Sequence, residues 1–180
     1  ENGYADWFSV PEHVLPDITR KTLCIIVDTH VPHLLESKEV YEACRQVVVI
    51  DHHRKMVSHI DNAVIFYHVP FASSASEMVT ELLQYFPLKQ NIGRYEAEAL
   101  LSGIMLDTKN FVLKTGVRTF EAAAYLRRLG ADTVAVRKLF AGSMVDYQRK
   151  IRLVAAAEIY RGCAISGAEG VSGNEMRLVA

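Results

Sequence analysis

An apolar run that ends in three consecutive side chains able to bind metal constrains this chain more than any other feature. Residues 47–53 read Val-Val-Val-Ile-Asp-His-His. The run has the length and β-branched composition of a buried strand, so Asp51, His52 and His53 should emerge together at its carboxyl end. Open α/β sheets place their binding sites at that edge. The run therefore predicts both a strand and the place of a functional site.

A second apolar run upstream has the same form. Residues 23–27 are of strand length and are followed by Asp28-Thr29-His30. Between the two runs, residues 37–45 combine a serine start, early acids and a late arginine, which favours a short helix. A strand, a helix and a strand form a right-handed unit whose two strands are parallel. Asp28 and Asp51 should therefore leave the sheet at one edge, together with the histidines beside them.

The rest of the chain predicts one more strand and several helices. Apolar residues at helical spacing, capping signals and stops place these elements. The strand is expected at residues 63–69, and the helices at 75–85, 97–107, 119–129, 132–140 and 145–160. Ser74 followed by Glu77 is the signature of a capping box at the first of these helices. The predicted fold class is α/β, with a mainly parallel sheet flanked by helices.

Composition restricts the class of protein. Half of the 180 residues are hydrophobic, which is enough for a globular core. A formal net charge of −1 without blocks of like charge argues against a protein that grips long nucleic acid. Three widely spaced cysteines favour a reducing compartment, so we expect a cytoplasmic domain. No apolar run approaches the roughly 20 residues that span a membrane.

Three short motifs resemble, in the same order, the later motifs of the DHH phosphoesterase superfamily. They are residues 27–30 (VDTH), 51–53 (DHH) and 106–108 (LDT). Longer segments resemble the GdpP-type cyclic-di-AMP phosphodiesterases, namely residues 49–54 (VIDHHR), 70–74 (PFASS), 78–83 (MVTELL), 106–111 (LDTKNF) and 118–122 (RTFEA). The resemblance covers residues 20–160, which is far more than a short pattern that arises by chance.

The chain also departs from the family pattern. Members open with a His-x-x-x-Asp-x-Asp motif on their first strand, and no such stretch occurs in the 180 residues. We expect residues 1–162 to be a DHH-type catalytic domain that lacks its first motif and is therefore truncated. Residues 163–180 are expected to be a linker or the start of the DHH-associated domain. The fragment alone should be impaired as an enzyme.

The resemblance implies a site with two manganese ions. Two metals about 3.5–4 Å apart activate water and neutralise charge on phosphoryl oxygens. Carboxylates and imidazoles without neighbouring thiolates fit manganese better than zinc. By resemblance, Asp28, His52 and His53 are catalytic, and Asp28, His52 and Asp107 bind the metal. The resemblance also implies that Asp51 and His53 support these ligands or contact the substrate. Arg54, from its charge, and Ser73 and Ser74, at a helix start, are candidates for contact with phosphate.

Each of these residues has an ordinary structural alternative. An acid at a strand end, such as Asp28, is often a helix cap, and Asp107 alone resembles a solvated turn residue. His30 either joins the metal or is satisfied by backbone groups. The two serines either bind phosphate at a helix start or simply cap the helix. Arg54 either counters phosphate charge or is solvated.

The expected function is a metal-dependent phosphodiesterase that hydrolyses cyclic-di-AMP to the linear dinucleotide. Two alternatives stay open. One is another DHH phosphoesterase, acting on short oligonucleotides, on pAp or on pyrophosphate. The other is a non-catalytic, truncated module that senses nucleotides. The expected partner is a cyclic dinucleotide rather than long nucleic acid, and the resemblance leaves open a homodimer and a parent protein anchored in the cell membrane outside this chain.

Overall fold

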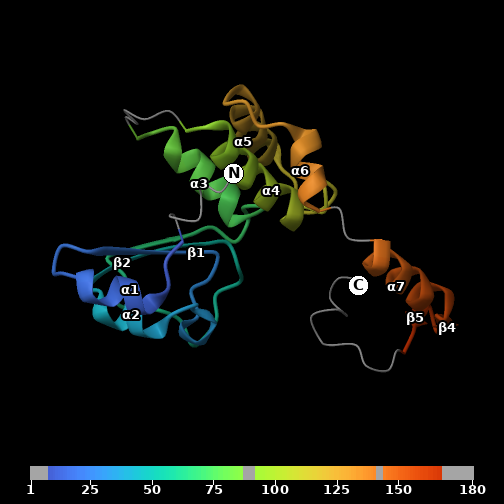
Figure 1. The fold of residues 1–180 in the computed structure, drawn as a ribbon, viewed down its shortest axis with the longest axis horizontal. Helices are drawn as coiled ribbons and strands as arrows, with labels where there is room; N and C mark the ends of the chain where they lie inside the picture. Colours follow the sequence, from blue (N-terminus) through green and yellow to red (C-terminus); the bar gives the residue numbers. More distant parts are fainter. Residues whose placement is uncertain (1–7, 87–91, 141–143, 168–180) are drawn as a thin grey trace. The chain divides into compact units, whose positions relative to one another are not determined.

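The computed structural model describes residues 8–86, 92–140 and 144–167 (Figure 1). The chain divides into two compact units, Glu1–Val136 and Arg137–Ala180. The first unit contains a parallel sheet, the helices that pack on it and every predicted site residue. The described residues of the second unit contain the end of a helix shared with the first, one further helix and a hairpin. The functional boundary expected after residue 162 stays a prediction.

The elements of the first unit alternate between strands and helices at the start and are helical afterwards. In chain order they are α1 (Pro11–Val14), η2 (Leu15–Asp17), β1 (Leu23–Val27), η3 (Pro32–Leu34), α2 (Lys38–Ala43), β2 (Gln46–Asp51), β3 (Ile65–His68), α3 (Ala75–Leu83), α4 (Arg94–Asp107) and α5 (Val117–Arg128). α6 (Thr133–Leu139) runs across the division between the units. The predicted strands and helices up to residue 140 are confirmed with small shifts of their ends.

β2 is the central strand of the sheet, and both of its neighbours run parallel to it. The strand order is β1-β2-β3. Ile26 pairs with Val49, and Ile50 pairs with Tyr67. Since the strands are parallel, their carboxyl ends meet at one edge of the sheet. The predicted α/β architecture with a parallel sheet is confirmed.

The two faces of β2 are buried in different ways. Val47 and Val49 pack on one face with Ile60 and with Tyr41 of α2. On the opposite face, Ile50 packs with Ala72 and with Met78 of α3. Successive side chains of a strand point to opposite faces, so a continuous apolar run can serve both sides. The sequence of β2 is therefore apolar at successive positions because the strand is covered on both faces.

A separate apolar core lies between α4 and α5, and α3 packs against both helices. α3, α4 and α5 pack against one another, as the green to orange ribbons of Figure 1 show. Buried side chains come from α4 and α5, and Val136 of α6 joins them. α3 also contacts β2 and so connects this helical group to the sheet. Within the described ranges, no helix has both the length and the apolar content that crossing a membrane requires.

The second unit corrects one prediction. The helix expected at residues 145–160 ends earlier, because α7 covers Met144–Ala155 and β4 (Glu158–Tyr160) pairs antiparallel with β5 (Cys163–Ile165). Arg161 and Gly162 both have positive φ, at 49° and 81°. A two-residue loop with this backbone favours a hairpin. The turn and the β-forming residues Ile159 and Tyr160 therefore override the helical pattern. Residues 168–180 lie outside the described ranges.

Candidate metal centre

The predicted ligands lie at the carboxyl edge of the sheet and at the end of a helix. Asp28 follows β1, and His52 and His53 follow β2. Asp107 is the last residue of α4, which the helical core holds in place through Ile104 and Met105. The register of β1 with β2 puts Val27 beside Ile50. Asp28 and His52 are therefore brought together by strand pairing, and Asp107 by helix packing.

His52 is the central side chain of this group. Its Nε2 atom lies 3.4 Å from Oδ1 of Asp28 and 3.4 Å from Oδ2 of Asp107. The atom is buried and makes no hydrogen bond with any described residue. On the other side of the ring, Nδ1 lies 3.3 Å from the carbonyl oxygen of Ala72. A carbonyl can only accept, so Nδ1 donates to Ala72, and Nε2 is the ring atom that faces the two carboxylates.

These separations fit a divalent ion. Two ligands held at roughly 2.1 Å from one ion lie about 3.0–3.4 Å apart in octahedral or tetrahedral geometry. The 3.4 Å between Nε2 and each oxygen, taken pair by pair, agrees with this spacing. A buried nitrogen without a hydrogen bond also needs a partner. One imidazole and two carboxylates are a donor set that suits manganese, magnesium or zinc.

The charges of the group perturb its titration. The interaction with the Asp28 carboxylate, opposed by burial and assisted by the charge of Asp107, raises the pKa of His52. Burial and then the negative charge of Asp28 raise the pKa of Asp107. Two carboxylates that share a small space disfavour each other's charged form. A cation between them would remove that repulsion.

Asp28 adopts an unusual backbone conformation. Its φ is +69°, in the left-handed region that a residue with a side chain seldom visits. Its N–H still donates to the carbonyl of Ile50 at 3.0 Å, so the parallel ladder continues to this residue. The left-handed turn therefore begins where the strand pairing ends. Strained backbone of this kind is concentrated at functional sites.

A buried hydrogen-bond network stands behind the ligands. Asp51 is fully buried, and its carboxylate accepts from His30 Nδ1, from the backbone N–H of His53 and, at 2.8 Å, from His53 Nδ1. His30 Nε2 accepts from the N–H of Met56 at 3.0 Å, so the His30 ring is neutral with its proton on Nδ1. Burial raises the pKa of Asp51, but the bonds from His30 and His53 outweigh burial and hold it below its usual value.

His53 offers a second possible ligand. Asp28, His52 and His53 can each contribute an atom to a group within 4.8 Å. The His53 side chain is 56% exposed, and its Nδ1 lies 4.0 Å from Oδ1 of Asp28. Because Nδ1 donates to Asp51, Nε2 is the ring atom of His53 that is left to meet a metal or a substrate. Two ligand sets thus share Asp28 and His52. Among the described residues, the set with His53 has all three ligand atoms within 4.8 Å of one another, whereas Asp107 lies near His52 alone.

The remaining predicted residues, Arg54, Ser73 and Ser74, make no described contact with the side chains of the candidate ligands. Arg54 is exposed and has no hydrogen bond or ion pair with another described residue. Ser74 accepts from the N–H of Glu77 at 3.0 Å and thereby caps α3. The hydroxyl of Ser73 donates to the Glu77 carboxylate at 2.6 Å. Both serines are buried, so the capping interpretation accounts for their hydroxyls. A contact between any of the three and substrate stays a prediction.

Several contributing residues carry no sequence signal of their own. His30 reaches Asp51 across 21 residues, and nothing local to either shows that they pair. Thr119 of α5 donates to Glu77 of α3 at 2.6 Å across 42 residues. A pattern read along one helix cannot show a hydrogen bond between two helices. The sequence indicates Glu77 only as part of a capping box at the start of α3.

Comparison with known proteins adds a family and several relatives. The family described as "DHH family, N-terminal domain" matches residues 4–104. The chain is 46% identical over 157 residues to the cyclic-di-AMP phosphodiesterase PdeA of Listeria monocytogenes, covering 87% of this chain and 24% of the relative. It is 44% identical over 171 residues to the cyclic-di-AMP phosphodiesterase GdpP of Geobacillus thermodenitrificans, covering 94% and 26%. The chain thus spans about a quarter of the length of these curated relatives.

A solved structure shares the fold. An exopolyphosphatase-related protein from Bacteroides fragilis superposes with a TM-score of 0.72 at 21% identity, over 88% of this chain and 46% of that one. At this level of identity the likeness concerns the arrangement of strands and helices. The parallel sheet flanked by helices is therefore a known architecture.

The backbone of Asp28 makes a prediction about stability. Alanine in the left-handed region is strained and glycine is not, so Asp28→Gly should be more stable than Asp28→Ala by about 1 kcal/mol. Denaturant unfolding in the presence of a chelator measures the difference. The same pair at Thr29, which lacks a positive φ, should give the opposite order. Equal stabilities of the two Asp28 variants would mean that this residue is not left-handed in solution.

The Asp51 network makes a prediction about acid. Asp51→Asn removes an acceptor from buried donors and should cost about 2 kcal/mol of unfolding free energy at pH 7. The folded pKa of Asp51 is lowered, so its stabilisation is complete above its unfolded pKa of about 3.9 and is lost as pH falls through the folded value. Unfolding curves of both proteins should therefore converge below about pH 4. A difference that persists in acid would contradict this assignment.

Proposed function

The chain belongs to the DHH family, and on that basis we propose that it is the catalytic part of a metal-dependent phosphodiesterase that hydrolyses cyclic-di-AMP to the linear dinucleotide. One observation carries the proposal. The buried Nε2 atom of His52 has no hydrogen-bond partner and faces the carboxylates of Asp28 and Asp107 at equal distances of 3.4 Å. A divalent cation would give this atom the partner it lacks, with Asp28 and either His53 or Asp107 as its further ligands.

The relatives support the substrate class. PdeA and GdpP are both named cyclic-di-AMP phosphodiesterases, and their identity to this chain lies between 44% and 46% over most of its length. The similarity extends across the segments that build the candidate metal centre. Because the chain covers about a quarter of each relative, the substrate of the whole protein is a proposal here. Homodimer formation and attachment of the parent protein to a membrane are further predictions.

Asp28, His52 and Asp107 would hold the ion, and we favour manganese because the donors are carboxylate oxygens and one imidazole without a thiolate. The free cysteines Cys24 and Cys44 are not among the described groups that could bind metal. When bound, such an ion lowers the pKa of a coordinated water and neutralises charge on the phosphoryl oxygens.

The chain's own residues prepare the site for that chemistry. The carbonyl of Ala72 fixes the proton of His52 on Nδ1. Asp51 fixes the proton of His53 on Nδ1 and leaves His53 Nε2, on an exposed ring, to meet the substrate. Protonated at Nε2, His53 can donate to a phosphate oxygen or to the leaving ribose oxygen. The buried pair Asp51 and His30 holds that ring in position.

Substitution of the ligands tests the proposal. In the longest natural protein that carries this chain, His52→Gln and Asp107→Asn should each lower the manganese-dependent rate of cyclic-di-AMP hydrolysis by about 100-fold or more, because a ligand is lost. Chromatographic separation of the linear dinucleotide measures the rate. His33→Gln is the matched control, because His33 is exposed, lies in η3 and is not in the described group that could bind metal.

The substrate is tested in the same assay. Cyclic-di-AMP should be hydrolysed faster than a linear oligoribonucleotide, pAp or pyrophosphate at equal concentration. Faster hydrolysis of one of the other three compounds would show that the proposed substrate is wrong, and the protein would still be a phosphoesterase. Unchanged hydrolysis by His52→Gln would contradict the proposed site itself.

A further inference from the structure

One peptide unit connects His52 to a buried carboxylate. The carbonyl of Ala72 accepts from His52 Nδ1 at 3.3 Å, and the N–H of Ser73, which belongs to the same peptide unit, donates to Oε2 of Glu77 at 3.4 Å. The carbonyl and N–H of a trans peptide unit point in opposite directions. The unit therefore lies between the imidazole and the carboxylate with one polar group turned to each.

Glu77 does more than a helix cap requires. In a capping box the acid at this position reaches back to the backbone N–H of the cap residue, here Ser74. The Glu77 carboxylate instead accepts from the N–H and the hydroxyl of Ser73, one residue earlier. The predicted capping box is thus formed in one direction only, from Ser74 to the N–H of Glu77.

α5 holds the same carboxylate from its other side. Thr119 accepts from the N–H of Gly116 at 3.1 Å, so its own hydroxyl proton is free to be donated to Glu77 at 2.6 Å. Glu77 is 1% exposed, and Nε of Arg118 lies 4.0 Å from its Oε1. A buried carboxylate is costly unless donors surround it, and here α5 and the loop before α3 supply them.

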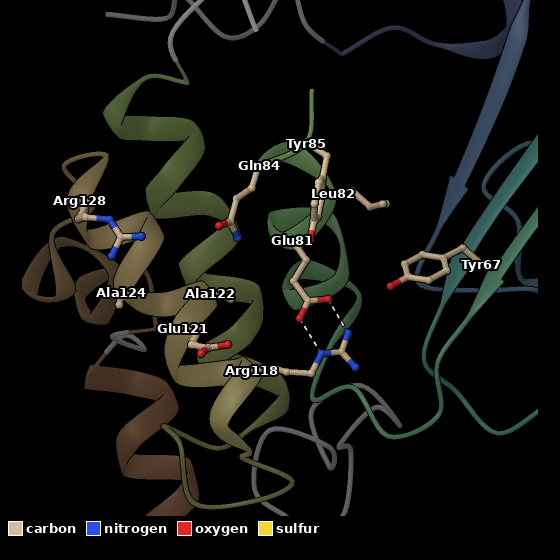
Figure 2. Close-up of a pocket in the computed structure, with 10 residues that line it drawn as sticks. All are labelled: Tyr67, Glu81, Leu82, Gln84, Tyr85, Arg118, Glu121, Ala122, Ala124 and Arg128. Atoms are coloured by element: carbon tan, nitrogen blue, oxygen red, sulfur yellow. Dashed lines mark hydrogen bonds and ion pairs between the residues drawn. The ribbon is translucent and has the colours of Figure 1, made fainter. Parts of the chain in front are cut away.

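An ion pair on the surface fixes the two helices to each other beside this carboxylate. Arg118 of α5 makes a two-pronged contact with Glu81 of α3, with 2.6 Å between Nε and Oε1 (Figure 2). The pair lies in a groove of about 530 Å³ along α3 and α5, lined also by Tyr67 of β3. Glu77 is one turn before Glu81 on α3, so α3 and α5 are joined at two successive turns, by Thr119 to Glu77 and by Arg118 to Glu81.

We propose that Glu77 is a positioning residue for the metal ligand His52 and acts through the peptide unit of Ala72 and Ser73. A carboxylate that accepts from the N–H of a peptide unit polarises the carbonyl of that unit and makes the carbonyl a better acceptor. The polarised carbonyl holds the His52 proton on Nδ1 and fixes the ring with Nε2 toward Asp28 and Asp107. Carbonyl or carboxylate partners of this kind raise the basicity of ligating imidazoles. The inference rests on the proposed function, because it concerns the same metal site.

The test compares two variants of α3 in the 180-residue chain. Glu77→Gln keeps the shape and one acceptor oxygen but removes the charge, whereas Ser74→Ala removes the cap and leaves the Glu77 carboxylate. Long-range proton–nitrogen NMR of the metal-free protein, recorded at alkaline pH and assigned with His52→Gln, reports which His52 nitrogen carries the proton. Titration with manganese(II) followed by electron paramagnetic resonance reports the affinity.

Glu77→Gln should raise the share of His52 protonated on Nε2 and weaken manganese binding about tenfold. Ser74→Ala should lower the melting temperature and leave both His52 readouts as in the wild type. If Glu77→Gln does not fold, Thr119→Val, which removes a competing donor and leaves the Glu77 charge to the N–H of Ser73, should shift both readouts in the opposite direction and by less.

A folded Glu77→Gln protein with the wild-type His52 tautomer and an affinity within about twofold of wild type would overturn the proposal and leave Glu77 a structural residue. Equal shifts of the tautomer in Ser74→Ala and Glu77→Gln would overturn it too, because helix capping alone would then explain them. Failure of the wild type to bind manganese would count against the proposed function instead. The tautomer, measured without metal, would still decide the role of Glu77.

Discussion

Parallel pairing of β1 with β2 is the constraint on which the candidate metal centre depends. The register puts Val27 beside Ile50, so the residues that follow the two strands leave the sheet together. The N–H of Asp28 continues the pairing with Ile50, and the left-handed turn at Asp28 begins only there. A shift of one residue would turn every side chain of β2 to the opposite face and separate Asp28 from His52. Buried residues on both faces of β2 make such a shift costly.

The buried carboxylates near the ligands need hydrogen-bond donors to be stable. Asp51 lies inside the protein, where an unpaired charge is costly, and its donors come from His30 and His53. Glu77 is buried in the same way, and its donors come from the loop before α3 and from α5. Each carboxylate is connected by hydrogen bonds to one histidine of the DHH motif, Asp51 to His53 and Glu77 to His52. Two buried acids thus orient two neighbouring imidazoles, one directly and one through a peptide unit.

Part of this arrangement could be predicted from sequence. Apolar runs that end in Asp28 and in Asp51-His52-His53 are local signals, and the rule for parallel crossovers joins them without further assumptions. Asp107 could be included only by its place in the motif order, because helix packing rather than local sequence brings it to His52. The bonds from His30 to Asp51 and from Thr119 to Glu77 join residues 21 and 42 positions apart, and neither leaves a periodic trace. The hairpin at residues 158–165 was missed because its turn residues, Arg161 and Gly162, were outweighed by a helical pattern before them.

Diffraction from crystals grown with manganese tests the central claim most directly. Data recorded at the manganese absorption edge locate the ion independently of the protein atoms. The account predicts an anomalous peak at roughly 2.0–2.2 Å from His52 Nε2 and from one carboxylate oxygen each of Asp28 and Asp107. A peak beside His53 instead of Asp107 would show that His53 is the third ligand, and the site at Asp28 and His52 would stand. No peak beside His52 at saturating manganese would contradict the account.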